Sequence, residues 1–340
     1  MSHVTMHSFV SKLGLLPRVT QHSTHTYPSI TYSHVTHSLS LTLSHNHTFI
    51  LSYSTSHTTT HSYPLHSPIS TPNSQNHIHL TLQPPSSPTP KPPSKLFPRH
   101  EAYILEARRL QKKYSPQIHI IIAFEAEFIR PSYAPLVQAL FDASPHVDYF
   151  IGSVHHVHSI PIDYDKATYA AAVAAAGGSE ERLYEDYYDL QYDMLRALKP
   201  RIVGHFDLIR LMSEDPGRDV RQWKGVWEKI RRNLEYAAEI GAWLECNSAA
   251  LRKGLDEPYP GRIISEEWLK LGGKFTMSDD SHGIAQVATN YSRALTFLES
   301  LGVKHVWTFE RKNHPEAGET TKAELIESGV PLSEFRRNFS

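Results

Sequence analysis

The residues of this sequence that could do chemistry gather at the ends of short apolar runs. Each run with the character of a buried strand is followed by a side chain that binds metal ions or phosphate well. In chain order these side chains are Glu125, His155, His205, Asn247, Asp280 and His282. Because the carboxyl ends of the strands of a β/α barrel converge on one mouth, we expect these residues to share one site.

Metal binding is the chemistry that this set predicts, with Glu125, His155, His205, Asp280 and His282 as the ligands. Asp280 and His282 are two positions apart, so on a strand they would share a face and could contact one ion together. Imidazole and carboxylate ligands suit Zn, Mn or Fe, and such ions activate water and hold phosphoryl oxygens. A single strand-end histidine is more often structural, so the prediction rests on the repeated pattern.

A second group of residues could bind an anion. The chain has no P-loop, G-x-G-x-x-G or G-x-S-x-G motif, so nucleotide-loop and serine-hydrolase functions lose support. In the stretch "NSAALRKG", Arg252 can contact two phosphate oxygens at once, and Lys253 adds positive charge. The alternative is that both are solvated charges near a helix end.

Helices and strands alternate over the part of the chain that carries these residues. The predicted helices span residues 100–114, 135–144, 180–200, 219–241, 265–273 and 287–302. The predicted strands span residues 117–127, 147–156, 201–207, 242–248, 274–282 and 305–310. This alternation predicts an α/β fold with a parallel sheet, either doubly wound or a barrel.

The first hundred residues differ in composition from the rest of the chain. They contain no Asp or Glu, the first acid being Glu101, and they hold fourteen of the 23 histidines. Few large apolar groups and no sustained period predict a disordered His/Ser/Thr/Pro-rich segment over residues 1–95. One domain is expected over residues 96–340. We also hypothesise that residues 1–95 stem from a wrong first exon or from non-coding DNA.

The overall composition argues against several classes of protein. A formal net charge of −1 gives no reason to expect a nucleic-acid or membrane-surface partner. The lone Cys246 excludes a disulfide framework and fits a reducing compartment. No apolar run approaches the ~20 residues that cross a bilayer, and the start lacks the pattern of a secretory signal. We therefore expect a cytoplasmic protein, of open oligomeric state.

Residues 97–310 resemble the histidinol-phosphate phosphatases of the PHP (polymerase and histidinol phosphatase) superfamily, of the type found in fungi. The stretches that carry the resemblance are "FEAEFIRP", "GSVHHVHSIPIDYD", "KPRIVGHFDLIRL", "LECNSAALRKGLDEPYP" and "SDDSH". The resemblance implies a distorted (β/α)7 barrel with a cluster of two or three divalent metal ions at its mouth. It also implies a hydrolase that acts on a small-molecule phosphate ester. The expected reaction converts L-histidinol phosphate to L-histidinol and phosphate in histidine biosynthesis.

The resemblance also assigns roles to single residues. Glu125 looks like the bridging carboxylate of the metal cluster, and His155 and His205 look like further ligands. Asp280 and His282 are similar to the D-x-H pair that closes the family's site.

Arg252 looks like the family's phosphate-binding arginine, and Asp279 would lie behind the ligands. The resemblance thus implies catalytic roles for Asp280, His282 and Arg252. The residues expected to bind substrate or its phosphate are Arg252, Lys253, Asn247 and His158.

One part of the family's pattern is not recognisable here. The family begins with a strand that ends in H-x-H, followed by a strand that ends in a Glu-His pair. His77 and His79 have H-x-H spacing, as do His45 and His47. In so His-rich a tract this spacing arises by chance, and we expect neither pair to bind metal. The barrel is therefore expected to be incomplete at its N-terminal strands and to hold fewer ions.

Three functions remain open on these grounds. The leading one is hydrolysis of histidinol phosphate. The second is a PHP phosphoesterase with another phosphate substrate. The third is an inactive truncated PHP-domain protein, either a remnant or a faulty gene model.

Overall fold

The computed structural model describes residues 37–43, 48–55, 96–115, 117–312 and 322–339. The histidine pairs with H-x-H spacing, His45 with His47 and His77 with His79, lie outside the described residues. The predicted metal ligands and substrate-binding residues all lie within them.

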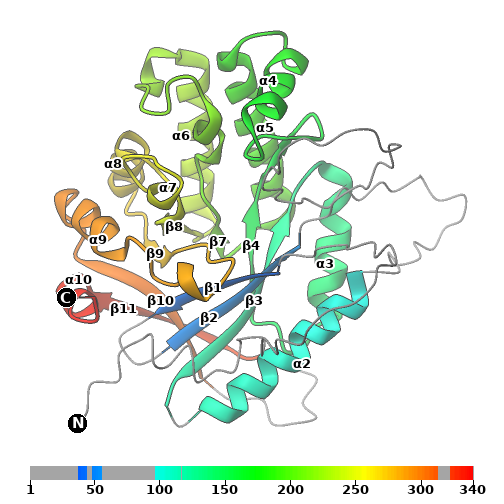
Figure 1. Ribbon diagram of the computed structural model, residues 1–340, viewed down its shortest axis with the longest axis vertical. Helices are drawn as coiled ribbons and strands as arrows, with labels where there is room; N and C mark the ends of the chain where they lie inside the picture. Colours follow the sequence, from blue (N-terminus) through cyan, green and yellow to red (C-terminus); the bar gives the residue numbers. More distant parts are fainter. Residues whose placement is uncertain (1–36, 44–47, 56–95, 116, 313–321, 340) are drawn as a thin grey trace, which may run out of the picture.

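A curved sheet forms the centre of the molecule. In the described part of the chain it has seven strands, in the order β1 (His37–Leu43), β2 (Thr48–Thr55), β3 (His119–Glu127), β4 (Tyr149–Ser153), β7 (Ile202–Val203), β8 (Trp243–Asn247) and β9 (Phe275–Ser278). The last five run parallel to one another. They curl into a half-barrel (Figure 1), which confirms the predicted α/β fold with a parallel sheet.

Helices cover the outside of the half-barrel. The described α-helices are α2 (Leu96–Tyr114), α3 (Ala134–Asp142), α4 (Lys166–Ala175), α5 (Glu180–Leu198), α6 (Lys224–Glu239), α7 (Ala249–Arg252), α8 (Arg262–Lys270), α9 (Tyr291–Ser300) and α10 (Leu332–Arg336). Short 3₁₀ turns lie at Pro131–Tyr133, Leu208–Met212, Val220–Gln222 and Ile284–Gln286. Helices α3, α5, α6 and α8 contact one another in that order around the barrel. None of the helices described has the length and apolar character that crossing a membrane requires.

Local sequence signals define both ends of helix α5, which joins β4 to β7. Helix α5 begins after Ser179, whose side chain accepts a hydrogen bond from the backbone N–H of Arg182. The negative charges of Glu180 and Glu181 in the first turn interact favourably with the positive end of the helix dipole. The helix ends at Leu198, and the next residue, Lys199, adopts a left-handed conformation directly before a proline. Because proline cannot continue a helix, the chain turns into β7 at this point.

The strands present different residues to the two faces of the sheet, as the two-residue period of a strand requires. On β3, Ile120, Ile122 and Phe124 belong to the outer core against the helices. Ile121 and Ala123 point inward and pack in a separate inner cluster. The other buried members of the inner cluster are Tyr149, Ile151, Ile202, Trp243 and Phe309.

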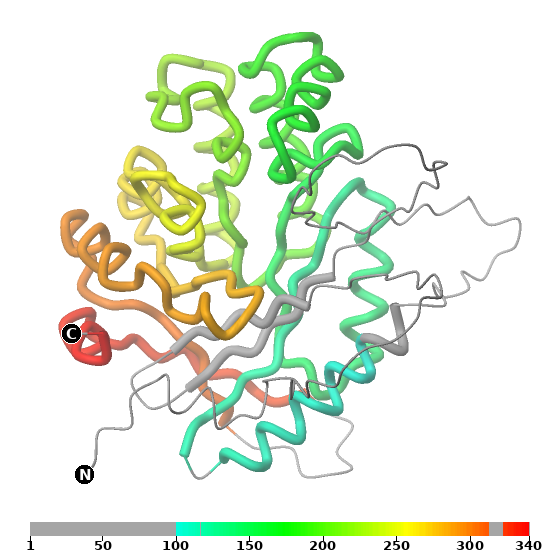
Figure 2. The backbone as a smooth tube through the Cα atoms, in the orientation of Figure 1, coloured from blue at the N-terminus to red at the C-terminus, as the bar shows by residue number. Residues whose placement is uncertain are grey.

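A C-terminal hairpin closes the base of the half-barrel. Strands β10 (His305–Arg311) and β11 (Leu325–Pro331) pair antiparallel, and β10 lies beside both β9 and β3. Figure 2 shows the orange and red end of the chain passing below the cyan β3. Phe309 stacks on Trp243 with ring centroids 4.1 Å apart. The base is therefore filled by aromatic rings, which leaves the opposite end of the strands as the mouth.

The observed strands end earlier than the sequence predicts. The strand expected over residues 147–156 ends at Ser153, and the one expected over residues 274–282 ends at Ser278. Beyond these points the chain leaves the central sheet, because His156 belongs to a short separate hairpin and Asp279 accepts hydrogen bonds from the loop backbone. Beyond residue 96, the periodicity also left unpredicted the helices α4, α7 and α10, the strand β11, and the short hairpin of β5 (His156–Val157) and β6 (Ile160–Pro161).

The segment expected to be disordered contains two described strands. Strand β1 pairs antiparallel with β2, and β2 pairs parallel with β3. Residues 38–43 read "SLSLTL", a two-residue alternation that favours a strand. This alternation covers only six residues, and the Ser-, Thr- and His-rich sequence on either side favours disorder. The division of the chain at residue 95 stays a prediction.

Candidate metal centre

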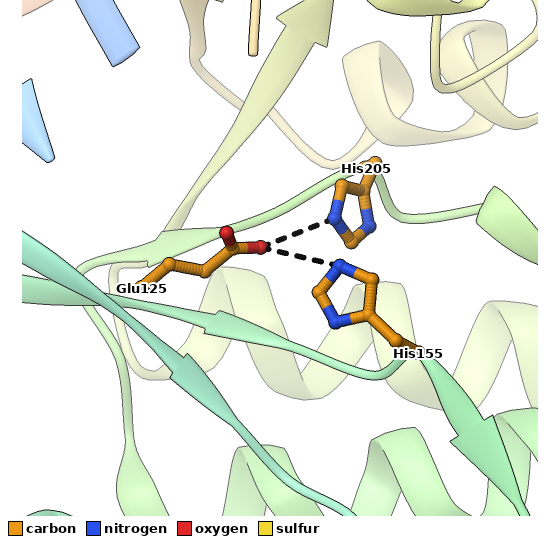
Figure 3. Close-up of side chains that lie close together, drawn as sticks. All are labelled: Glu125, His155 and His205. Atoms are coloured by element: carbon orange, nitrogen blue, oxygen red, sulfur yellow. Dashed lines mark hydrogen bonds and ion pairs between the residues drawn. The ribbon is translucent and has the colours of Figure 1, made fainter. Parts of the chain in front are cut away.

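Three side chains converge at the mouth of the half-barrel. Glu125 extends from the end of β3, and His155 and His205 follow β4 and β7 (Figure 3). Oε1 of Glu125 lies 3.2 Å from Nε2 of His205 and 3.5 Å from Nε2 of His155. Among the residues described, these three form the one group whose ligand atoms all lie within 4.8 Å of one another.

A glycine allows the two histidine-bearing segments to approach. Gly204 directly precedes His205, and a Cβ atom there would lie 2.2 Å from Oγ of Ser153. Because that distance is far inside van der Waals contact, a side chain at this position would require the Ser153 hydroxyl to rotate away or the two segments to move apart. The imidazole rings of His155 and His205 instead lie with their centroids 4.6 Å apart.

A second glutamate on β3 holds one of the histidines from behind. Oε2 of Glu127 lies 2.6 Å from Nδ1 of His155, and Oε1 accepts from the backbone N–H of His155 at 3.3 Å. The same Oε1 lies 3.1 Å from Nδ1 of His156. If the strand continued through both residues, its alternation would point His156 away from His155. However, β4 ends at Ser153, so the alternation does not extend that far.

Burial and neighbouring charges shift the pKa values of the two glutamates and of His155. Burial would raise the pKa of Glu125, but the hydrogen bond from His205 and the positive charges of His155 and His205 lower it overall. Burial would likewise raise the pKa of Glu127, and the charge and hydrogen bond of His155 lower it well below its usual range. Burial would lower the pKa of His155, but Glu127 and then Glu125 raise it well above its usual value. The carboxylate charge of Glu125, flanked by two imidazoles, suits a divalent cation.

The donor set itself fits a metal ion. Nε2 of both histidines faces the carboxylate of Glu125, and the buried Nδ1 of His205 has no hydrogen-bond partner among the described residues. One carboxylate and two imidazoles with further positions open form a ligand set used by Zn and other first-row metals.

Sequence reasoning missed Glu245, a buried carboxylate on the inner face of β8. It accepts the backbone N–H of His205 at 3.0 Å and the side-chain amide of Asn247 at 3.1 Å. Burial raises the pKa of Glu245. Glu245 and Asn247 are two positions apart on a strand, the same signal that selected Asp280 and His282. The side chain of Asn247 is engaged in this network and also accepts the backbone N–H of Ala249 at 2.9 Å.

The predicted D-x-H pair lies on the loop after β9 and is not part of the three-residue group. Asp280 has a left-handed backbone, with φ of 47°. Nδ1 of His282 donates to the carbonyl of Asp280 at 2.9 Å, and the His282 side chain is 44% exposed. The buried Asp279 accepts the backbone N–H groups of Ser281 and Ala288, so it shapes this loop from behind.

Arg252 contacts this same loop. Its Nη1 donates to the carbonyl of Asp279 at 2.7 Å and its Nη2 to the carbonyl of Asp280 at 2.9 Å. The neighbouring Lys253 is exposed. His158 lies at the turn of the hairpin formed by β5 (His156–Val157) and β6 (Ile160–Pro161), and its Nε2 lies 2.8 Å from Oδ2 of Asp186. No contact joins Lys253 or His158 to the three-residue group among the described residues.

Comparison with known proteins places this site in a family. The model of the PHP domain matches residues 94–249, which include Glu125, His155 and His205. The "Probable histidinol-phosphatase" of Schizosaccharomyces pombe is 40% identical over 220 residues, covering 64% of this chain and 72% of the relative. The chain belongs to the PHP histidinol-phosphatase family. The resemblance inferred from the motifs is thereby confirmed.

Other members of the PHP histidinol-phosphatase family match at lower identity. The "Histidinol-phosphatase" of Saccharomyces cerevisiae is 28% identical over 269 residues, covering 71% of this chain and 78% of the relative. The crystal structure of hisK from Listeria monocytogenes superposes with a TM-score of 0.53 at 26% identity, covering 58% of this chain and 76% of that one. This likeness confirms the PHP-type barrel fold.

Proposed function

We propose that this chain hydrolyses L-histidinol phosphate to L-histidinol and phosphate at a divalent metal centre. The observation that carries the proposal is the convergence of Glu125, His155 and His205 at the barrel mouth, in a chain of the histidinol-phosphatase family. The substrate belongs to the small-molecule phosphate esters, and the reaction is that of a phosphoric monoester hydrolase in histidine biosynthesis.

The metal ions would be held by Glu125, His155 and His205, and Zn, Mn or Fe would suit this set. When bound, such ions lower the pKa of water and stabilise the charge that develops on a phosphoryl group. Glu125 brings the charge that retains the cation, and the two imidazoles bring neutral donors from separate strands. Glu245 holds the backbone of His205 in place through its hydrogen bond.

The loop after β9 is proposed to complete the site. Asp280 and His282 would add ligands, and Arg252 would bind the phosphate. Arg252 donates three hydrogen bonds, to the carbonyls of Asp279 and Asp280 and to Oγ1 of Thr289. A guanidinium has five N–H groups, so Arg252 could hold this loop and a phosphate oxygen together.

Lys253, Asn247 and His158 are proposed to contact the substrate or its phosphate. Asn247 already donates to Glu245, so its side chain would also orient that carboxylate. The absence of a nucleic-acid partner and a cytoplasmic location stay predictions.

The experiment that tests the proposal is phosphate release by the purified full chain. Histidinol phosphate would be compared with a panel of sugar and nucleotide phosphates, with and without added Zn²⁺ or Mn²⁺. Preferred, metal-dependent turnover of histidinol phosphate is the expected result. Faster turnover of another ester would assign a different substrate. No turnover together with no tightly held metal would mean that the chain is an inactive member of the family.

A further inference from the structure

Glu127 stands beside the proposed metal centre but outside its ligand group. It lies two positions after Glu125 on β3, so both carboxylates project from the same face of the strand. The three-residue group contains Glu125 and not Glu127. Both oxygens of Glu127 already have partners, Oε2 at Nδ1 of His155 and Oε1 at Nδ1 of His156 and the backbone of His155.

The contacts of Glu127 control how His155 presents its ring. An ionised carboxylate only accepts hydrogen bonds, so the proton on this side of the His155 ring is on Nδ1. When a metal ion takes the place of the proton on Nε2, the Nε2 lone pair would lie on the opposite edge of the ring, which faces Oε1 of Glu125 at 3.5 Å. The bond from the His155 backbone to the same carboxylate also fixes the segment directly after β4 ends.

We propose that Glu127 is a positioning residue that sets the tautomer and orientation of His155 for metal binding, while His156 holds Glu127 in place. This inference rests on the metal centre of the proposed function. A carboxylate behind a ligating imidazole keeps the metal-facing nitrogen aimed and makes it a stronger donor. Nδ1 of His156 lies 3.1 Å from Oε1 of Glu127, which leaves Oε2 to His155.

The first test is metal affinity, measured by competition with a chromophoric chelator for Zn²⁺ and Mn²⁺. Glu127→Gln should weaken binding by about 10- to 100-fold, because the amide is a poorer partner for the imidazole N–H. Glu327→Gln is the matched control, because Glu327 also spans two partners, Arg201 and Lys274, and its side chain is 32% exposed against 30% for Glu127. Its affinity should equal that of the wild type.

A double-mutant cycle separates positioning from direct ligation. If Glu127 acts through His155, adding Glu127→Gln to His155→Ala should cause little further loss of affinity. Additive losses would overturn the proposal, because they would make Glu127 an independent ligand. Unchanged affinity in the Glu127→Gln single variant would overturn it as well. Circular dichroism and the thermal midpoint check that the variants fold, and Glu127→Asp replaces Glu127→Gln if the latter does not.

Metal binding and hydrolysis, measured separately, distinguish the role of Glu127 from the proposed function. A wild-type chain that binds metal but does not hydrolyse histidinol phosphate would overturn the function and leave the role of Glu127 standing. A wild-type chain that binds neither Zn²⁺ nor Mn²⁺ would overturn both.

Discussion

Nε2 of His205 lies 3.2 Å from Oε1 of Glu125, although 80 positions separate the two residues in the chain. The contact exists because β3 and β7 both flank β4, with all three strands pointing the same way. The carboxyl ends of parallel strands meet at one edge, so residues that follow separate strands become neighbours.

Removing either histidine of this group should weaken metal binding and lower turnover of histidinol phosphate, each by more than about 100-fold, since even supporting residues of metal sites contribute 10- to 100-fold. His155→Ala and His205→Ala test this by metal analysis and phosphate release. A chelator should have the same effect on the wild type, and added metal should restore activity. His305→Ala, at an exposed histidine on β10, is the control. Normal metal content in either site variant would remove that residue from the centre.

Asp280→Ala and His282→Ala should each abolish turnover while folding stays intact. Both side chains lie on the loop after β9, where their loss leaves the outer core untouched. Phosphate release and the thermal midpoint would be measured together. A wild-type rate in one of the variants would exclude that residue from the site.

Gly204→Ala should weaken metal binding without preventing folding. The added Cβ would lie 2.2 Å from Oγ of Ser153, so either the Ser153 hydroxyl rotates away beside Glu125 and His205, or the end of β7 moves and carries His205 with it. Affinity measured by chelator competition checks the result. Gly217→Ala is the matched control, because a Cβ there meets nothing closer than 3.9 Å. Equal affinities for the two variants would contradict the prediction.

Arg311→Met should destabilise the fold by about 3–5 kcal/mol, because it leaves the carboxylate of Asp148 buried without its partner. Nη2 of Arg311 lies 2.6 Å from Oδ2 of Asp148, and both side chains are 1% exposed. Denaturant unfolding measures the loss. The more exposed pair of Arg336 and Glu299 supplies the comparison, and Arg336→Met should cost no more than about 1 kcal/mol.

His100 should make stability depend on pH between about 4 and 6.5. Burial, and then the charge of Lys322, lower the pKa of His100 to about 4. Its Nε2 donates to Oγ of Ser144 at 2.7 Å. The unfolded chain would bind this proton near pH 6.5, so the stabilisation is fully present above that value and is lost as pH falls toward 4. The expected loss is on the order of 2 kcal/mol, allowing for solvent screening.

His100→Gln is the variant that checks this dependence, because glutamine keeps hydrogen-bonding groups and does not titrate in this range. Unfolding free energies at pH 7.5, 6.5, 5.5 and 4.5 would be compared with those of the wild type. The variant should show a shallower decline toward acid, and parallel curves for the two proteins would rule out the role of His100.

The site was predictable where its residues are defined by their place at strand ends. Glu125, His155 and His205 each follow an apolar strand, and parallel topology alone brings such positions together. Glu127 and Glu245 were not predicted as parts of the site, because each acts through a bond to a residue that follows another strand. The predicted strand over residues 274–282 failed beyond Ser278, where Asp279 and Arg252 bond to the loop backbone and determine its path.

The sequence by itself determined the alternation of strands and helices, the family and the three strand-end residues. These follow from local patterns, because apolar periodicity and motif spacing are properties of short stretches of chain. Only the tertiary structure decided which nitrogen of His155 faces the centre, that His156 shares Glu127 with it, and that Asn247 is committed to Glu245. Those outcomes depend on which side chains of separate strands meet, and a hydrogen bond is directional enough to select one arrangement.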